Sequence, residues 1–109
     1  MFTIDDNAKV MFYSKPTNLL KSIDGLTQVV LSEWGMDVEP HTYFLFCNFK
    51  KNRFKVLYTD GTHLAIWFKR FNGTLTFSFS NEMITFDKDG FFAFLQKTRS
   101  KQLRRRNKV

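Results

Sequence analysis

Several residue types that support disulfide-bonded, low-complexity or metal-binding proteins are scarce in this chain of 109 residues. Cys47 is the one cysteine, so no disulfide can form within the chain, which favours a reducing, cytoplasmic setting. Two prolines and five glycines are too few for a low-complexity protein. Two histidines and one cysteine cannot assemble a zinc site of the usual ligand spacing, so we expect no metal site.

Long apolar runs are also absent. No stretch approaches the ~20 consecutive apolar residues that a membrane-spanning helix needs. The first residues, Met-Phe-Thr-Ile-Asp-Asp, have neither the basic start nor the apolar stretch of a signal peptide. We therefore expect no contact with a membrane.

The residues that commonly carry catalysis are few and scattered. His41 lies in a loop, His63 is expected to begin a strand, and neither has a Cys, Ser or second His at catalytic spacing. No glycine-rich phosphate loop is present. Cys47 ends an apolar run, as a buried structural thiol often does. The sequence therefore predicts a protein that is not an enzyme, with no cofactor and no small-molecule substrate.

Positive charge is concentrated at one end of the sequence. The formal net charge is +7, yet residues 1–96 hold ten Lys or Arg and all ten Asp and Glu. Residues 97–109 hold the other seven Lys and Arg. The sequence therefore predicts one neutral folded domain over residues 1–96, followed by a basic C-terminal tail over residues 97–109.

The first half of the chain predicts a strand and then a helix. Residues 9–13 have the composition of a short strand, and residues 14–18 supply a turn and candidate N-cap residues. Apolar residues then recur at steps of four and three positions, which indicates a helix with one core-facing stripe. Gly35 is expected to end this helix. The stripe consists of Leu19, Ile23, Leu26, Val30 and Trp34.

The second half predicts a hairpin-rich sheet. The aromatic and β-branched segments 43–48, 53–59, 63–71 and 74–80 are typical of strands. Asp60-Gly61 and Asn72-Gly73 are hairpin signals, so residues 53–80 are expected to form a three-stranded meander. A final helix, capped by Asp87 or Asp89, would present Phe91, Phe94 and Leu95. The predicted fold class is α+β: a mainly antiparallel sheet of about five strands with two helices, the second helix running into the basic tail.

Both faces of the predicted hairpin are apolar. A two-residue turn at Asp60-Gly61 would place Thr59 opposite Thr62, with Phe54, Val56 and Tyr58 on one face. Leu57, Ile66 and Phe68 would lie on the other face, so both faces are expected to be covered in part. The predicted core comprises Leu26, Val30, Phe46, Val56, Ile66 and Phe68.

A cluster of basic residues is expected at the end of this hairpin away from its turn. Such a cluster is consistent with a solvated sheet end that keeps an edge soluble. It is equally consistent with a phosphate-contacting patch between aromatic residues, which the basic tail would extend. The predicted nucleic-acid-binding residues are Lys50, Lys51, Arg53, Lys55, Lys69, Arg70, Arg99, Lys101, Arg104, Arg105 and Arg106.

The segment from Asn52 to Phe71 resembles the accessory protein of a group of bacterial insertion sequences, often called the TnpB type. (An unrelated RNA-guided nuclease shares that name.) The family pattern is a basic strand, an acidic-Gly turn, an aromatic strand ending in Lys-Arg, and a Gly-x-Phe strand start. Matching residues are Arg53, Lys55, Val56, Leu57, Asp60, Gly61, Leu64, Phe68, Lys69, Arg70, Phe71 and Gly73. The similarity also includes Ile23-Asp24-Gly25-Leu26 and Phe44-Leu45-Phe46. It departs from the family at Asn18-Leu19-Leu20-Lys21, where Asp-Met-Arg-Lys is usual, and at His63, where Gly is usual.

This resemblance implies a non-catalytic helper in transposition, encoded beside a DDE transposase that cuts and joins the DNA. It implies two partners, DNA and the transposase of the same element. One alternative is a protein–protein adaptor that docks on the transposase without significant DNA binding of its own. Another is an RNA-binding module that stacks bases on its Phe and Trp side chains.

Overall fold

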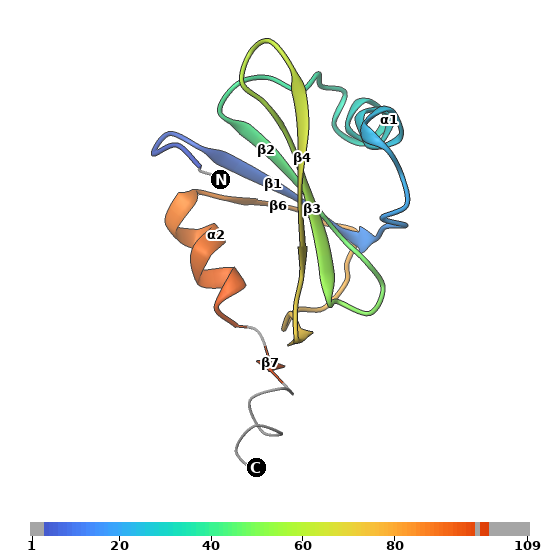
Figure 1. Cartoon of the computed structure of the whole chain (residues 1–109), viewed down its shortest axis with the longest axis vertical. Helices are drawn as coiled ribbons and strands as arrows, with labels where there is room; N and C mark the ends of the chain where they lie inside the picture. The colour runs from blue at the N-terminus through green and yellow to red at the C-terminus, as the bar shows by residue number, and fades with distance from the viewer. Residues whose placement is uncertain (1–3, 98, 101–109) are drawn as a thin grey trace.

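A five-stranded sheet forms the centre of the computed structural model, which describes residues 4–97 and the backbone of residues 99 and 100 (Figure 1). The strand order is β4-β3-β2-β1-β6, in which β1 and β2 are parallel and the other neighbours are antiparallel. Two helices complete the fold, so the predicted α+β class with five sheet strands and two helices is confirmed. In chain order, the strands of the sheet and the two helices are β1 (Lys9–Pro16), α1 (Ile23–Trp34), β2 (Thr42–Cys47), β3 (Arg53–Thr59), β4 (Leu64–Arg70), β6 (Met83–Phe86) and α2 (Lys88–Leu95).

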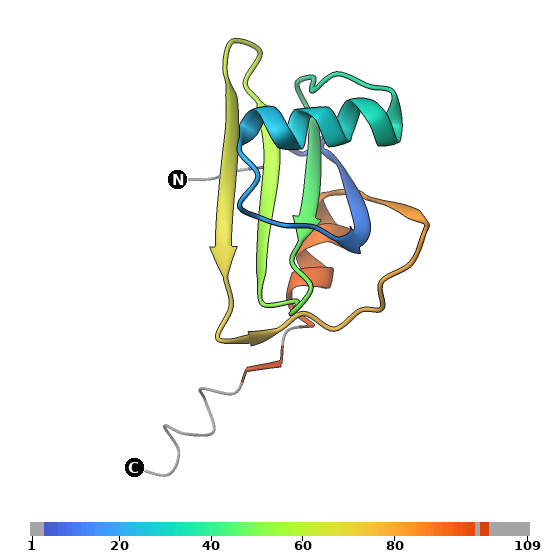
Figure 2. The ribbon, with the colours of Figure 1, turned by 90° about the vertical axis from the view of Figure 1, so that its right-hand side faces the viewer.

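Each face of the sheet is covered by one helix, so its strands are apolar on both sides (Figures 1 and 2). Alternate residues of a strand point to opposite faces. In β2, Phe44 and Phe46 pack with Leu26 and Val30 of α1. Residues 43, 45 and 47 of the same strand join the core that contains α2. The expectation that both faces are covered in part is confirmed, and Phe68 of β4 and Ile84 of β6 remain exposed.

Helix α1 connects the parallel strands β1 and β2. It begins later than predicted, because Ser22 is its N-cap and accepts a hydrogen bond from the backbone N–H of Gly25. Leu19 therefore lies before the helix, and none of residues 14–18 caps it. Gly35 ends the helix as predicted, with φ of 65° and its N–H donating to the carbonyl of Leu31.

The β3–β4 hairpin is present, but the predicted two-residue turn is wrong. Thr59 pairs with Leu64 rather than with Thr62, so the loop contains four residues, 60–63. The Asp60 carboxylate accepts hydrogen bonds from the backbone N–H groups of Thr62 and His63, which stabilises the longer loop. The register shifts by two residues, and an even shift keeps every side chain on its predicted face.

The predicted strand over residues 74–80 is also wrong. After β4 the chain forms only the short β5 (Gly73–Thr74), which pairs with β7 (Arg99–Ser100). The N–H of Leu75 donates to the carbonyl of Lys51, and the N–H of Ser80 donates to the carbonyl of Ser14. These bonds lead residues 75–82 across the end of the sheet to its far edge (Figure 2). There β6 pairs with β1 and supplies the fifth strand, which the sequence did not indicate.

Helix α2 closes the second core. Asp87 is its N-cap, through a carboxylate that accepts from the N–H of Gly90 at 2.7 Å, and this confirms one of the two predicted caps. Phe91 and Phe94 are buried and Leu95 is half-buried, as the helical spacing predicted. The helix ends at Leu95, short of β7.

The predicted core is largely confirmed. Leu26, Val30, Phe46 and Val56 are fully buried, and Ile66 is half-buried against the α1 side of the sheet. Phe68 contradicts the prediction, because 49% of its surface is exposed. It lies on the same face as Ile66, two residues farther along β4.

Candidate nucleic-acid interface

The basic residues of β3 and β4 meet where the register of the hairpin places them. Arg53 begins β3, Arg70 ends β4, and the two are directly paired across the strands. Lys55 lies on the same face of the sheet as both arginines. Lys69 pairs with Phe54 and projects to the opposite face. The sheet therefore separates the predicted cluster, with three cations on the α1 side and Lys69 on the α2 side.

The turn between β2 and β3 holds the remaining basic residues of the sheet end. The side-chain oxygen of Asn48 accepts hydrogen bonds from the backbone N–H groups of Asn52 and Arg53, each at 3.1 Å. Its amide nitrogen donates to the Asn52 side chain at 2.7 Å. Lys51 has φ of 61°, a left-handed conformation that is uncommon in residues with a Cβ, and the Asn48 hydrogen bonds stabilise the turn that contains it. The turn is therefore held firmly, and it presents Lys50 to solvent.

Lys51 is engaged within the fold. Its ammonium donates to the carbonyl of Phe77 at 2.5 Å and lies over the rings of Phe77 and Phe79 at 4.9 and 5.0 Å. Contacts of this kind fix the crossing segment 75–82 to the β2–β3 turn. The position of Lys51 thus has a structural explanation that Lys50, Arg53 and Arg70 lack.

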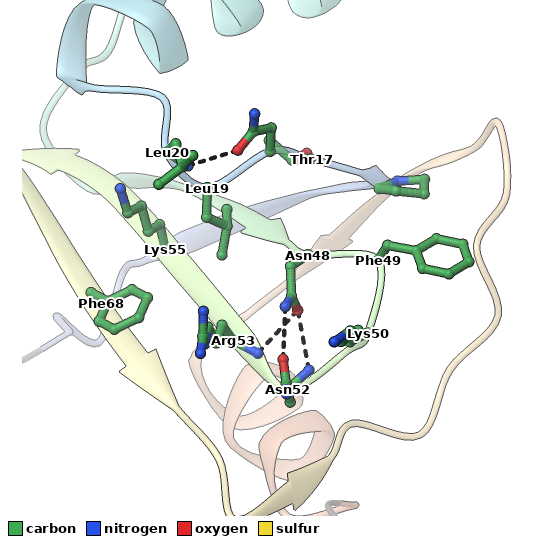
Figure 3. A pocket seen from close by; sticks show the side chains of 12 residues that line it. Thr17, Leu19, Leu20, Asn48, Phe49, Lys50, Asn52, Arg53, Lys55 and Phe68 are labelled. Carbon is green, nitrogen blue, oxygen red and sulfur yellow. Dashed lines mark hydrogen bonds between the residues drawn. The ribbon is translucent and has the colours of Figure 1, made fainter.

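A groove of about 860 Å³ lies on the α1 side of this sheet end. The segment between β1 and α1 forms one wall and the β2–β3 turn forms another, while β3 and β4 contribute Arg53, Lys55 and Phe68 (Figure 3). In this view Phe68 and Phe49 lie on opposite sides of the groove, with Leu19 and Arg53 between them. Lys55 links β3 to the segment between β1 and α1, because its ammonium donates a hydrogen bond to the carbonyl of Lys21 at 3.2 Å.

The lining of the groove is cationic and apolar. It includes Lys50, Arg53 and Lys55, and it includes no Asp or Glu. Within residues 4–97, neither Arg53 nor Arg70 forms an ion pair. Like charges directly opposite in adjacent strands destabilise a sheet, so the Arg53–Arg70 pair is an arrangement that an anion would relieve.

The start of the basic tail lies at the same end of the sheet. β5 begins three residues after Arg70, and its pairing with β7 brings Arg99 opposite Thr74. The chain therefore enters the tail beside the last residues of β4. Lys101, Arg104, Arg105 and Arg106 lie outside the described residues.

The residues that sequence reasoning missed are the apolar ones of the groove. Phe49 is 75% exposed and Leu20 is 91% exposed, and both line it together with the half-exposed Phe68. A signal existed for Phe49, which stands between Asn48 and Lys50 in a polar, basic turn. An aromatic residue in such a turn has no core to fill.

Comparison with known proteins assigns this chain to a family. The family model that describes the IS66 Orf2-like proteins matches residues 8–105. The chain belongs to the IS66 Orf2-like family. This confirms the resemblance to accessory proteins of insertion sequences, a family with no known catalytic activity. No curated protein and no solved structure gives a significant match to the chain.

In this IS66 Orf2-like protein, the thiol of Cys47 is buried in the core and the carboxylate of Asp60 stabilises the β3–β4 loop. Burial raises the pKa of the Cys47 thiol to about 12, so it remains protonated at neutral pH. Hydrogen bonds from the backbone N–H groups of His63 and Thr62 lower the pKa of Asp60 to about 2. That carboxylate is explained by the hairpin loop. Among the residues the structure describes, no three His, Cys, Asp or Glu side chains gather as a metal site would need.

The helices of the IS66 Orf2-like protein are short. Over the described part of the chain, neither has the length and apolar character to cross a membrane. The longer one, α1, has 12 residues, and Asp24 and Glu33 lie within it.

Proposed function

We propose that this protein is a non-catalytic accessory factor of insertion-sequence transposition that binds DNA through the phosphate backbone. The contact would be made by the basic sheet end, meaning Lys50, Arg53, Lys55 and Arg70, together with the basic tail. The observation that carries the proposal is the direct pairing of Arg53 with Arg70, since neither has a carboxylate partner in the described structure. The pairing of β5 with β7 supports a shared surface, because it starts the tail at that same end.

Phosphate binding explains why such a pair is tolerated. Exposed like charges in register cost stability in the free protein. Phosphates that approach both arginines replace repulsion with charge-assisted hydrogen bonds, and condensed counterions leave the DNA. The contact is therefore expected to tolerate any sequence, because phosphate contacts carry no base information.

The test measures binding to a short labelled DNA duplex at several salt concentrations, with fluorescence anisotropy as the readout. Each neutralised phosphate contact is expected to change the slope of log K against log salt by about 0.9. Replacing Arg53 and Arg70 with Gln should therefore flatten the slope by about two units. The matched control is Lys9→Gln, which removes one exposed charge at the opposite end of the sheet, where Lys9 pairs with Thr42.

Two outcomes would contradict the proposal. One is a loss of slope from Lys9→Gln as large, per charge, as that from the arginine variants. The other is the absence of duplex binding by the intact chain at about 50 mM salt, where phosphate-driven binding is strong. The second outcome would favour the adaptor that docks on the transposase without DNA.

The transposase of the same element is the protein partner that we propose. Capture of the transposase by this chain, before and after nuclease treatment, separates direct docking from bridging by DNA. Capture that survives the nuclease supports a direct contact, and capture that is lost supports bridging.

A further inference from the structure

Two phenylalanine rings flank the groove without a core to pack into. Phe49 is 75% exposed and Phe68 is 49% exposed. By contrast, Phe46 of β2 and Phe54 of β3, the strands on either side of the turn that carries Phe49, are fully buried. Phe49 and Phe68 therefore expose ring surface to solvent beside the cations of the sheet end.

The ring of Phe49 is supported from behind. It stacks on Phe79 with ring centroids 6.3 Å apart and an angle of 11° between the planes. Phe79 is in turn held by the Lys51 ammonium and by an edge contact with Phe77 at 5.0 Å. The turn that carries Phe49 is braced by Asn48. A ring fixed in this way loses little conformational freedom when a flat partner stacks on it.

The charge of the groove selects an anionic partner. Lys50, Arg53 and Lys55 contribute three cations, and no carboxylate lines the groove. Its volume of about 860 Å³ is within the range of about 300–1,000 Å³ that holds a small ligand. Such a space suits a few unpaired nucleotides and is too small to enclose a duplex, whose major groove alone is about 12 Å wide.

We propose that the groove binds single-stranded DNA, with bases stacking on Phe49 and Phe68 and phosphates contacting Lys50, Arg53 and Lys55. The proposal rests on the DNA-binding function proposed above and names the form of DNA that this site prefers. Positive charge that follows the backbone, combined with aromatic rings that accept any base, is how proteins bind single strands without sequence preference. Bases of an intact duplex are stacked on each other and cannot reach either ring.

The test compares binding of three labelled probes to the full-length protein: oligothymidine, an abasic strand of equal length, and a duplex. Phe49→Ala and Phe68→Ala should each weaken oligothymidine binding roughly 5- to 150-fold, which corresponds to the stacking of one base. Neither variant should change binding of the abasic strand or of the duplex. The matched control is Phe92→Ala, which removes a ring that is 39% exposed on α2, at the other face of the sheet.

The outcomes separate this proposal from the one on which it rests. If the phenylalanine variants bind oligothymidine more weakly but keep the salt-dependent binding of the duplex, both proposals are supported. Equal affinity of wild type and phenylalanine variants for oligothymidine overturns the single-strand site and leaves phosphate binding intact. Tighter binding of an RNA strand than of its DNA counterpart, through the same rings, overturns the assignment to DNA. Loss of transposase capture with unchanged oligothymidine binding would instead make the groove a protein-docking site.

Circular dichroism melting of each variant completes the design. Phe49 is largely exposed and Phe68 is half exposed, so each variant should remain folded, with a thermal midpoint close to that of the wild type. If a variant unfolds, Phe→Leu at the same position retains the apolar volume and removes the aromatic face. That variant should show the same loss for oligothymidine.

Discussion

At the scale of single residues, Phe54 and Phe68 lie on neighbouring strands of one hairpin but have opposite environments. Phe54 is fully buried, and its ring contacts Trp67, Phe71 and Phe91 at centroid distances of 5.3, 5.3 and 6.4 Å. Phe68 faces the groove and is half exposed. Their contributions to the stability of the fold should therefore differ widely.

We predict that Phe54→Ala lowers the free energy of unfolding by about 3–5 kcal/mol, because it leaves a cavity in the α2-side core. Phe68→Ala should change it by less than about 1 kcal/mol, as substitutions at exposed sites usually do. Chemical denaturation of the two variants measures both values. A cost of similar size for both residues would mean that Phe68 is covered in solution.

The sequence could not distinguish these two residues, because both belong to apolar strands. Alternation assigns Phe68 to the face that it occupies, but it does not say how far α1 extends over that face. The helix packs on Leu57 and Ile66, and it lies toward the hairpin-turn end of the sheet (Figure 2). Phe68 is beyond its reach. The exposed ring that contributes to the candidate site is therefore a consequence of where one helix lies.

At the scale of elements, the end of α1 depends on one backbone conformation. Gly35 adopts φ of 65°, and a Cβ built there would meet nothing within 4 Å, so backbone strain is the only penalty. We predict that Gly35→Ala lowers the free energy of unfolding by about 1–2 kcal/mol. Gly35→Asn should cost less, since Asn adopts this conformation more readily. Thermal or chemical melting of both variants tests this, and an unchanged Gly35→Ala protein would contradict the assigned helix end.

Local signals predicted some elements, and long-range contacts determined the others. The stripe of α1, the β3–β4 hairpin and the face of α2 are encoded within short segments. Residues 74–80 alternate like a strand, yet the bonds from Leu75 to Lys51 and from Ser80 to Ser14 lead them across the sheet end. Those partners lie far away in the sequence, so no local pattern could reveal the crossing or the pairing of β6 with β1.

At the scale of the whole molecule, the sequence shows where positive charge lies along the chain, and the structure shows that the basic sheet end and the start of the tail lie at the same end of the sheet. Residues 1–96 are neutral overall, so attraction to phosphate must come from local clusters. The sheet end was predicted from the hairpin, because its far end collects Arg53 and Arg70 whichever even register is adopted. The approach of the tail to that end could not be predicted, because it depends on the β5–β7 pair.

The tail and the sheet end should consequently contact the same stretch of DNA. Arg104 follows Ser100 by four residues, so covalent geometry keeps its backbone within about 14 Å of β7. We predict that replacing Arg104, Arg105 and Arg106 with Gln in the full-length chain flattens the slope of log K against log salt by nearly three units on a duplex. The effect should add to that of the Arg53 and Arg70 variants, because the two sets would contact different phosphates of one duplex. Salt titrations of the two multiple variants and of their combination measure this additivity. Equal slopes for wild type and the tail variant would defeat the role of the tail, and a combination no flatter than either parent would contradict separate phosphate contacts by the two sets.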